Sequence, residues 1–314
     1  MLEWFCFPEG VKIWRGVRPP THADLKSHFS FSNDASIASF DACFNCATSF
    51  GWFLVSSTGE SYGSKNVKTY AAVVRFYAPA PYGIDETQDD FGQNVGHYDP
   101  SGKRSRLWIP VGICLTSNLP IVGTLEAMLL RLCEGLNSES SEWVSTKIHT
   151  ELISLIINAP SPLSSVVHCS VPFLSGERFH LTLPPPRGLP PLPHGACITS
   201  ACKLLGSDGL ITILAAVLTE SKVLLHSNDS SNLAMVGEVV NALIYPFAWA
   251  LPYVPVLPRE MLEFVEAPLS YIIGVPTCMM SSINADQLVD VVVIDLDANA
   301  RRRSLGIGVD TGGW

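Results

Sequence analysis

The hydrophobic and polar positions divide the chain into a strand-rich first part and a second part in which helices and strands alternate. In the first part, WFLVSS at 52–57 and TYAAVVRFYAP at 69–79 are dense in aromatic and β-branched residues, which predicts two strands. The stretch STGESYGSKN between them is made of turn formers, so we expect a β-hairpin. LWIPVGICL at 107–115 predicts a third strand, whereas residues 86–106 have few apolar positions and predict an exposed loop.

Two helices are expected after these strands. The first covers 123–136, where Thr124 is suited to the N-cap and Gly135 to ending the helix. The second covers 142–158, in which apolar residues recur at helical spacing until Pro160 stops them.

A strand at 164–171 is expected to end the first part, and from Ala196 onward the sequence predicts alternating helices and strands. The expected helices are 196–205, 208–220 and 233–244, and the expected strands are 222–226, 253–257 and 290–294. Continuous apolar strands between helices indicate a parallel sheet that is covered on both faces. We therefore expect an α/β fold class with two lobes.

The proline-rich stretch LPPPRGLPPLPHG at 183–195 lies between the two parts. Its six prolines enforce an extended, polyproline-like chain. Two interpretations stay open: a stiff surface connector, which such stretches usually are, or a ligand for an aromatic-lined groove.

Composition narrows the class of protein. Of 314 residues, 47% are apolar and 16% charged, and the net charge is −9. An acidic chain has no general attraction to phosphate backbones, which argues against nucleic acid as a partner. The N-terminus MLEWFCFPEG lacks the pattern of a signal peptide, and nine scattered cysteines fit a reducing compartment, so we expect a cytoplasmic location.

Two long uncharged stretches raise the question of a membrane span. They are Val239–Pro258, with four prolines, and Ala267–Ala285, with two. A segment in lipid must satisfy its own backbone hydrogen bonds, which prolines at this density prevent. The sequence therefore predicts buried core here and no transmembrane span.

GESYG at 59–63 matches the G-x-S-x-G nucleophile elbow of serine hydrolases. That motif needs a helix directly after the turn, because the helix N-terminus aims backbone N–H groups at the oxyanion. Here a predicted strand follows, so Ser61 is expected to lie in the hairpin turn and not to act as a nucleophile.

Other short motifs also lack the context that their chemistry requires. DLD at 295–297 follows a strand as in haloacid-dehalogenase-type phosphatases, but Asn299 stands where their motif has Thr or Val, and a solvated strand end is the alternative. Cys43 and Cys46 form one C-x-x-C pair; His22 and His28 would complete a zinc site, and two ordinary thiols are the alternative. No nucleotide-binding glycine motif is complete. We predict no cofactor, and a binding or regulatory role is favoured over an enzyme with its own nucleophile.

The stretch 218–258 resembles the central region of the DENN domain family. It contains LTESKVLLHS, LIYPFAW and YVPVLP, and the residues that carry the resemblance are Leu218, Glu220, Lys222, Ser227, Tyr245, Pro246, Phe247, Trp249, Tyr253, Pro255, Leu257 and Pro258. EAPLSYIIGV and VVVIDLD resemble the next two blocks of the family.

The N-terminal part resembles the same family. FCFPEGV at 5–11 is similar to its start, and Gly59, Tyr62 and Gly63 to its hairpin, with the spacing from Gly59 to Tyr62 one residue shorter than the family pattern. The resemblance covers residues 4–297 and implies a longin-like lobe (1–160), a central α/β lobe (161–300) and a tail (301–314) that is basic and then glycine-rich. The family's third, helical portion does not follow residue 297, which suggests a truncated or alternative product.

The resemblance implies a guanine-nucleotide exchange factor for Rab GTPases, which sit between a longin-like lobe and a parallel-sheet, Rossmann-like or flavodoxin-like lobe. Location on vesicle or endosomal membranes would then be peripheral. The alternative is an exchange-inactive scaffold that binds a GTPase or another trafficking protein. Ligands bind beyond the carboxyl ends of strands in open α/β sheets, so we expect partner contacts at Ser227, Asn228 and Asp229. Trp249 and Tyr253 are aromatic candidates for anchoring the partner, or else core residues.

Overall fold

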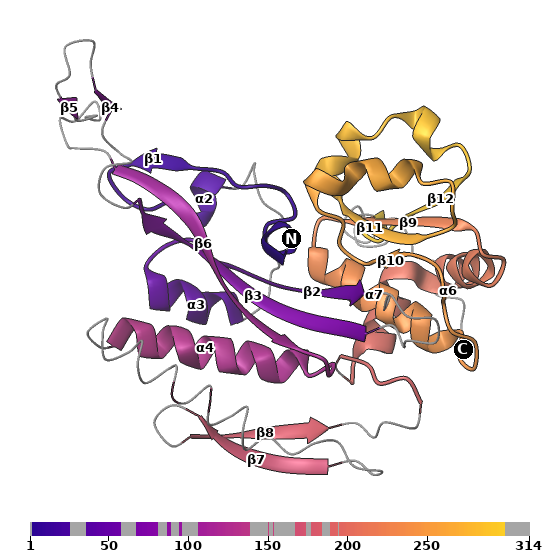
Figure 1. Cartoon of the computed structure of the whole chain (residues 1–314), viewed down its shortest axis with the longest axis horizontal. Helices are drawn as coiled ribbons and strands as arrows, with labels where there is room; N and C mark the ends of the chain where they lie inside the picture. The colour runs from indigo at the N-terminus through magenta and orange to yellow at the C-terminus, as the bar shows by residue number, and fades with distance from the viewer. Residues whose placement is uncertain are drawn as a thin grey trace, which may run out of the picture.

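The structure is a computed structural model. It describes residues 2–25, 36–57, 67–80, 87–88, 94–95, 106–138, 150, 153, 167–173, 177–183, 189–193 and 195–298. The fold is mixed α/β, with an antiparallel sheet in the N-terminal half (residues 2–138) and a separate parallel sheet in the C-terminal half (residues 195–298). Figure 1 shows the two sheets side by side, with helix α7 between them.

The antiparallel sheet has the strand order β1-β6-β3-β2. Its strands are β1 (Trp14–Gly16), β2 (Ser49–Ser57), β3 (Val67–Pro79) and β6 (Arg106–Ser117). β2 and β3 pair from Ser49–Arg75 to Ser57–Val67, which confirms the predicted hairpin and the three predicted strands. The turn with Ser61 lies outside the described residues.

Helices α3 (Ser36–Phe44) and α4 (Val122–Ser138) pack on one face of this sheet (Figure 1). The prediction of α4 is confirmed, but its predicted ends are wrong. The helix starts two residues before Thr124 and continues past Gly135. A glycine inside a helix costs only about 1 kcal/mol, and burial of Leu129 and neighbouring apolar residues against β3 outweighs this cost.

Two small antiparallel pairs complete the first part of the chain. The predicted loop 86–106 contains β4 (Thr87–Gln88) and β5 (Asn94–Val95), so it is not without regular structure. β7 (Val167–Phe173) confirms a predicted strand, whereas its partner β8 (Glu177–Leu183) was not predicted. This hairpin lies beside α4 (Figure 1). Of the predicted helix 142–158, only residues 150 and 153 are described, and both are helical.

The parallel sheet has the strand order β10-β11-β9-β12. Its strands are β9 (Lys222–Ser227), β10 (Tyr253–Val254), β11 (Ile272–Pro276) and β12 (Val291–Asp295). Strand β11 is central and was missed, because it lies in the proline-containing uncharged run that gives no alternation. Side chains of β9 enter a core with α6 and α7 on one face and a core with the 3-10 helices on the other. Those 3-10 helices are η1 (Arg259–Glu266), η2 (Thr277–Ser282) and η3 (Ala285–Leu288).

Helix α6 (Cys197–Leu218) contains both predicted helices 196–205 and 208–220, which meet at a break. Gly206 adopts φ 69° and ψ −178°, a backbone conformation open essentially only to glycine. By length and composition, α6 is the one helix among the described residues that is apolar enough to cross a membrane. Core helices of soluble proteins pass the same test, and α6 packs on α7, β9 and β12.

Helix α7 (Ser230–Leu243) connects the two halves of the molecule. It packs on β9 and β11 of the parallel sheet and on β2 of the antiparallel sheet. One apolar core is continuous across this junction, from Phe53 to Val236. The N-terminal helix α1 (Leu2–Cys6) joins the same core, where Phe5 stacks on Phe53 with ring centroids 5.8 Å apart.

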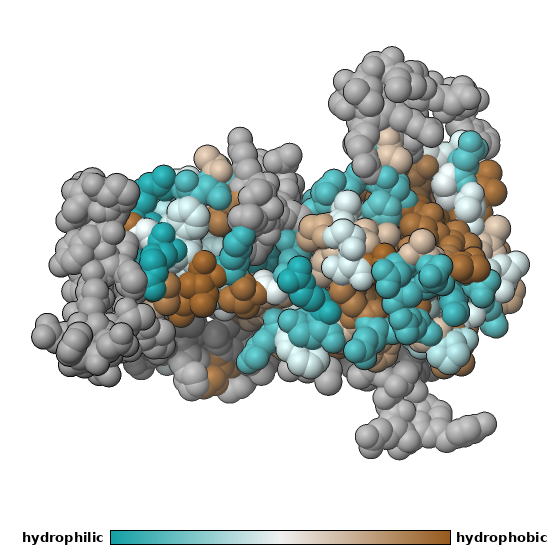
Figure 2. All heavy atoms as spheres, turned by 90° about the horizontal axis from the view of Figure 1, so that it is seen from above, coloured by the Kyte–Doolittle hydropathy of each residue, from teal (hydrophilic) through white to brown (hydrophobic). Residues whose placement is uncertain are grey.

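Apolar side chains also reach the surface of both halves. Figure 2 shows them most densely over the C-terminal half. The large exposed apolar residues of that half include Phe247, Phe264, Leu269, Val289 and Val293.

Candidate functional site

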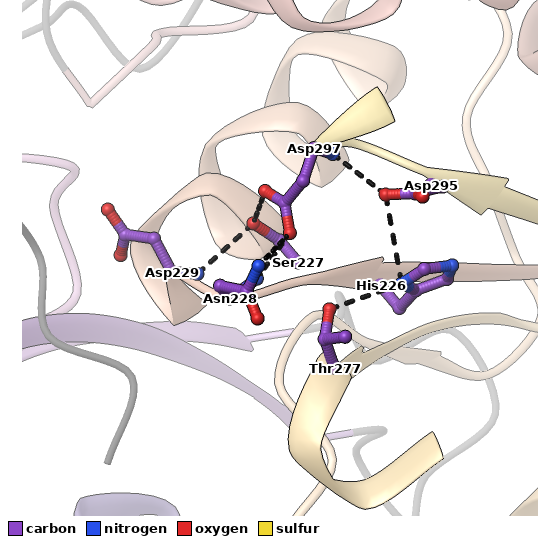
Figure 3. Close-up of polar contacts among 7 residues, drawn as sticks. All are labelled: His226, Ser227, Asn228, Asp229, Thr277, Asp295 and Asp297. Atoms are coloured by element: carbon purple, nitrogen blue, oxygen red, sulfur yellow. Dashed lines mark hydrogen bonds and ion pairs between the residues drawn. The ribbon is translucent and has the colours of Figure 1, made fainter. Parts of the chain in front are cut away.

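The carboxyl ends of β9 and β12 carry a hydrogen-bonded loop (Figure 3). The buried Ser227 hydroxyl donates to Asp297 Oδ1 at 2.9 Å. Asn228 donates to Asp297 Oδ2 twice, through its backbone N–H at 2.7 Å and its side-chain amide at 2.8 Å. The Asp297 carboxylate therefore fixes the loop that leads from β9 into helix α7.

Residues beneath this loop support the same arrangement. The backbone N–H of Asp297 donates to Asp295 Oδ1 at 2.9 Å, and His226 Nδ1 lies 3.9 Å from the same oxygen. His226 Nδ1 also lies 3.2 Å from the Thr277 hydroxyl at the start of η2. Both carboxylates of the DLD motif thus hold backbone and side chains of their own sheet, which is a structural role and not that of a phosphatase nucleophile.

We expect Asp297→Ala to lower the free energy of unfolding by about 1.5 kcal/mol, because a hydrogen bond to a charged group contributes at least that much. Without the carboxylate, the Ser227 hydroxyl and the Asn228 amides lose their acceptor. Urea unfolding of both proteins measures the difference. The control is Asp290→Ala, at an exposed carboxylate just before β12, where a change below about 0.5 kcal/mol is expected. Equal losses in the two variants would contradict this role of Asp297.

The same loop starts helix α7 at the junction of the two halves. Asp229 is the N-cap of α7, and its side chain accepts from the Ser231 N–H at 2.9 Å. Asp229 also lines a pocket between the two halves, here called the junction pocket. The pocket is lined by Phe7, Pro8, Glu9, Gly10, Ser49, Phe50, Gly51, Arg75, Asp229, Ser230 and Ser231.

Arg75 supplies the positive charge of the junction pocket. Its Nε donates to the Cys6 carbonyl, and its Nη1 donates to the Ser49 hydroxyl at 3.4 Å. The guanidinium lies over Gly51, where an added Cβ would come within 3.3 Å of Nη2. Burial lowers the pKa of Arg75, and the carboxylates of Glu9 and Asp229 are among the groups that oppose this shift. The lining of the pocket thus contains the cation of Arg75 and the carboxylates of Glu9 and Asp229.

The five residues predicted at the partner site do not all reach the surface. Asn228 is exposed and Asp229 is partly exposed, whereas Ser227 is fully buried. Trp249 is partly buried and donates from Nε1 to the Pro252 carbonyl at 3.2 Å. Tyr253 is 8% exposed and packs against Gly237 of α7. Arg75 and Glu9 were not predicted, because nothing near them in the sequence indicates that they line the same pocket as Asp229.

The C-x-x-C pair contains two buried thiols. Burial raises the pKa of both Cys43 and Cys46. His22, a ligand in the zinc hypothesis, instead lies with Nε2 at 2.7 Å from the Asp41 carboxylate. Within the described ranges, no group of three or more His, Cys, Asp or Glu residues is arranged to hold a metal ion, and His28 lies outside them.

The antiparallel and parallel sheets, with the junction pocket between them, define a mixed α/β protein. The family model of the DENN (AEX-3) domain matches residues 108–299, more than half of the chain. The chain therefore belongs to the DENN domain family.

Several curated proteins are similar to this chain. DENN domain-containing protein 1A of Mus musculus is 28% identical over 188 residues, which cover 59% of this chain and 17% of the relative. DENN domain-containing protein 1B of Mus musculus is 26% identical over 187 residues, covering 60% of this chain and 23% of the relative. DENN domain-containing protein 1A of Homo sapiens is 27% identical over 188 residues, covering 59% and 17%. The matched region thus spans about a fifth of each relative's length.

Proposed function

We propose that this chain is a guanine-nucleotide exchange factor for a Rab-type small GTPase. The observation that carries the proposal is the DENN family match over residues 108–299, which includes most of β6 and all of the parallel sheet. In this proposal the N-terminal region (1–160) is the longin-like lobe, the central region (161–300) is the Rossmann-like lobe, and the protein works in the cytoplasm at vesicle or endosomal membranes.

The proposed contact surface is the edge of the junction pocket and the loop beside it. Asn228 and Asp229 present polar groups there, and Arg75 and Glu9 line the same pocket as Asp229. Trp249 is the aromatic contact that remains partly exposed. Ser227 and Tyr253 are buried, so in this proposal they support the surface and do not contact the partner. Ser227 holds the loop through its hydrogen bond to Asp297, and Tyr253 packs against Gly237 of α7.

Exchange by this surface requires no nucleophile. An exchange factor binds the nucleotide-free GTPase more tightly than the nucleotide-loaded GTPase, and by linkage it weakens nucleotide binding by the same ratio. Structurally, the partner's switch segments are held away from the phosphates and Mg²⁺. A polar surface that combines one cation with carboxylates suits segments that otherwise close on a phosphate and a metal ion.

The proposal is tested by measuring affinity for both states of the same GTPase. Immobilised chain is titrated with a panel of Rab proteins, each prepared nucleotide-free and GDP-loaded. For one or a few Rabs we expect about 100-fold tighter binding of the nucleotide-free form, at the upper end of common coupling ratios. Equal affinity for both forms would contradict exchange and would favour the scaffold alternative.

A further inference from the structure

A charged side chain is buried where the two halves meet. Glu238 is on α7 and only 4% exposed. Its carboxylate accepts from Lys68 Nζ at 2.8 and 3.1 Å and from the Tyr70 hydroxyl at 2.7 Å. Lys68 and Tyr70 are two residues apart on β3, so both side chains leave the strand on the same side, toward α7. The carboxylate thus links the parallel-sheet half to the antiparallel-sheet half.

The surroundings of this carboxylate leave it little freedom. The Lys68 ammonium also lies 5.6 Å from the ring centroid of Tyr253, on β10 of the C-terminal half. Burial and then the negative charge of Glu238 raise the pKa of Tyr70 and of Tyr253 well above the ordinary value, so both hydroxyls stay protonated. Within the ion pair, the side chain of Glu238 is 3% exposed and that of Lys68 is 34% exposed. Water therefore reaches the lysine far more than the carboxylate.

Apolar contacts alone do not fix how the two halves are oriented. The core around α7 is apolar, and burial of apolar surface is favourable in any direction. A rotation of one half would separate Glu238 from Lys68 and Tyr70. The result would be a buried carboxylate without partners, which is strongly destabilising. The polar contact therefore penalises other orientations.

We propose that Glu238 is a positioning residue that fixes the relative orientation of the two halves and, with it, the shape of the junction between them. The consequence for exchange rests on the proposed function; the consequence for orientation does not. If only a fraction of molecules has the competent orientation, apparent affinity for the GTPase falls by that fraction, while a saturating partner still selects the competent form.

The test is Glu238→Gln in the full chain, measured by small-angle scattering and by steady-state GDP release. The amide keeps the size and an acceptor for Tyr70 but loses the charge that holds Lys68. We expect a larger maximum dimension in scattering and a KM for the GTPase raised about tenfold with kcat unchanged. The matched control is Glu134→Gln, which removes the exposed Arg131–Glu134 pair within α4 and is expected to change neither quantity.

Two further variants keep the proposal falsifiable if Glu238→Gln folds poorly. Lys68→Met removes the charged partner and Tyr70→Phe removes one hydrogen bond, and both are expected to raise KM in the same way, Tyr70→Phe by about threefold. A lower kcat at unchanged KM would indicate a smaller folded fraction and would overturn the positioning role. So would scattering that matches the control for every variant. If no Rab responds to the wild-type chain, the proposed function fails, and the scattering comparison still decides the orientation.

Discussion

Gly274→Ala is expected to lower the free energy of unfolding by about 3 kcal/mol, the upper range for overpacking a core. A Cβ at this position would lie 1.9 Å from the Pro255 carbonyl oxygen and 2.9 Å from its carbon. Both atoms are backbone, so no side chain can turn away to make room. The strands on this side of the sheet would have to separate, although the Leu257 N–H donates to the Gly274 carbonyl at 2.7 Å.

Calorimetry measures this effect as a fall in Tm of about 5–10 °C. The matched control is Gly123→Ala at the start of α4, where an added Cβ would meet nothing within 4 Å. Alanine there is expected to stabilise the protein by about 0.5 kcal/mol, because it restricts the unfolded chain and favours the helix. Equal Tm values for the Gly274→Ala variant and the wild type would show that the close approach to Pro255 does not exist.

Arg75→Ala is expected to lower kcat/KM for GDP release about 30-fold, which corresponds to about 2 kcal/mol. The substitution removes the cation that lines the junction pocket with Glu9 and Asp229, and it removes the donor to the Cys6 carbonyl. The two carboxylates would then line the pocket without a cation, and the N-terminal segment would lose one of its hydrogen bonds to β3. The measurement is release of fluorescent GDP from the responding Rab.

Arg75→Lys separates charge from geometry in this site. Lysine keeps the positive charge but lacks the planar fork, so an intermediate loss of about fivefold is expected. Arg131→Gln, in the exposed pair on α4, is the control at a distance and is expected to leave kcat/KM unchanged. If Arg75→Ala exchanged GDP like the wild type, the junction pocket would not be part of the contact surface.

The elements that local sequence determines were predicted well. The apolar run 222–226 becomes β9, and the polar residues after it become the cap of α7 at Asp229, because propensity and capping depend only on neighbours. The hairpin of β2 and β3 follows for the same reason. Strand β11 was missed because a fully buried strand has no alternation, and its flanking prolines obscure it.

Of the candidate site, the sequence predicted only the residues that directly follow strand β9. Asn228 and Asp229 follow from the rule that ligands bind at the carboxyl ends of strands. The other residues are brought together by segments far apart in the chain: Glu9 and Arg75 line one pocket with Asp229, and Glu238 pairs with Lys68. Glu238 is a lone charge on an apolar helix face, a pattern that indicates a buried partner but does not say where in the chain that partner lies.

The exchange activity is tested most directly by release of fluorescent GDP from a panel of purified Rab GTPases on adding this chain. We expect release from one or a few Rabs to accelerate in proportion to the concentration of the chain, and Arg75→Ala to remove most of the acceleration. Unchanged release from every Rab in the panel would contradict the proposal that this DENN-family chain is an exchange factor.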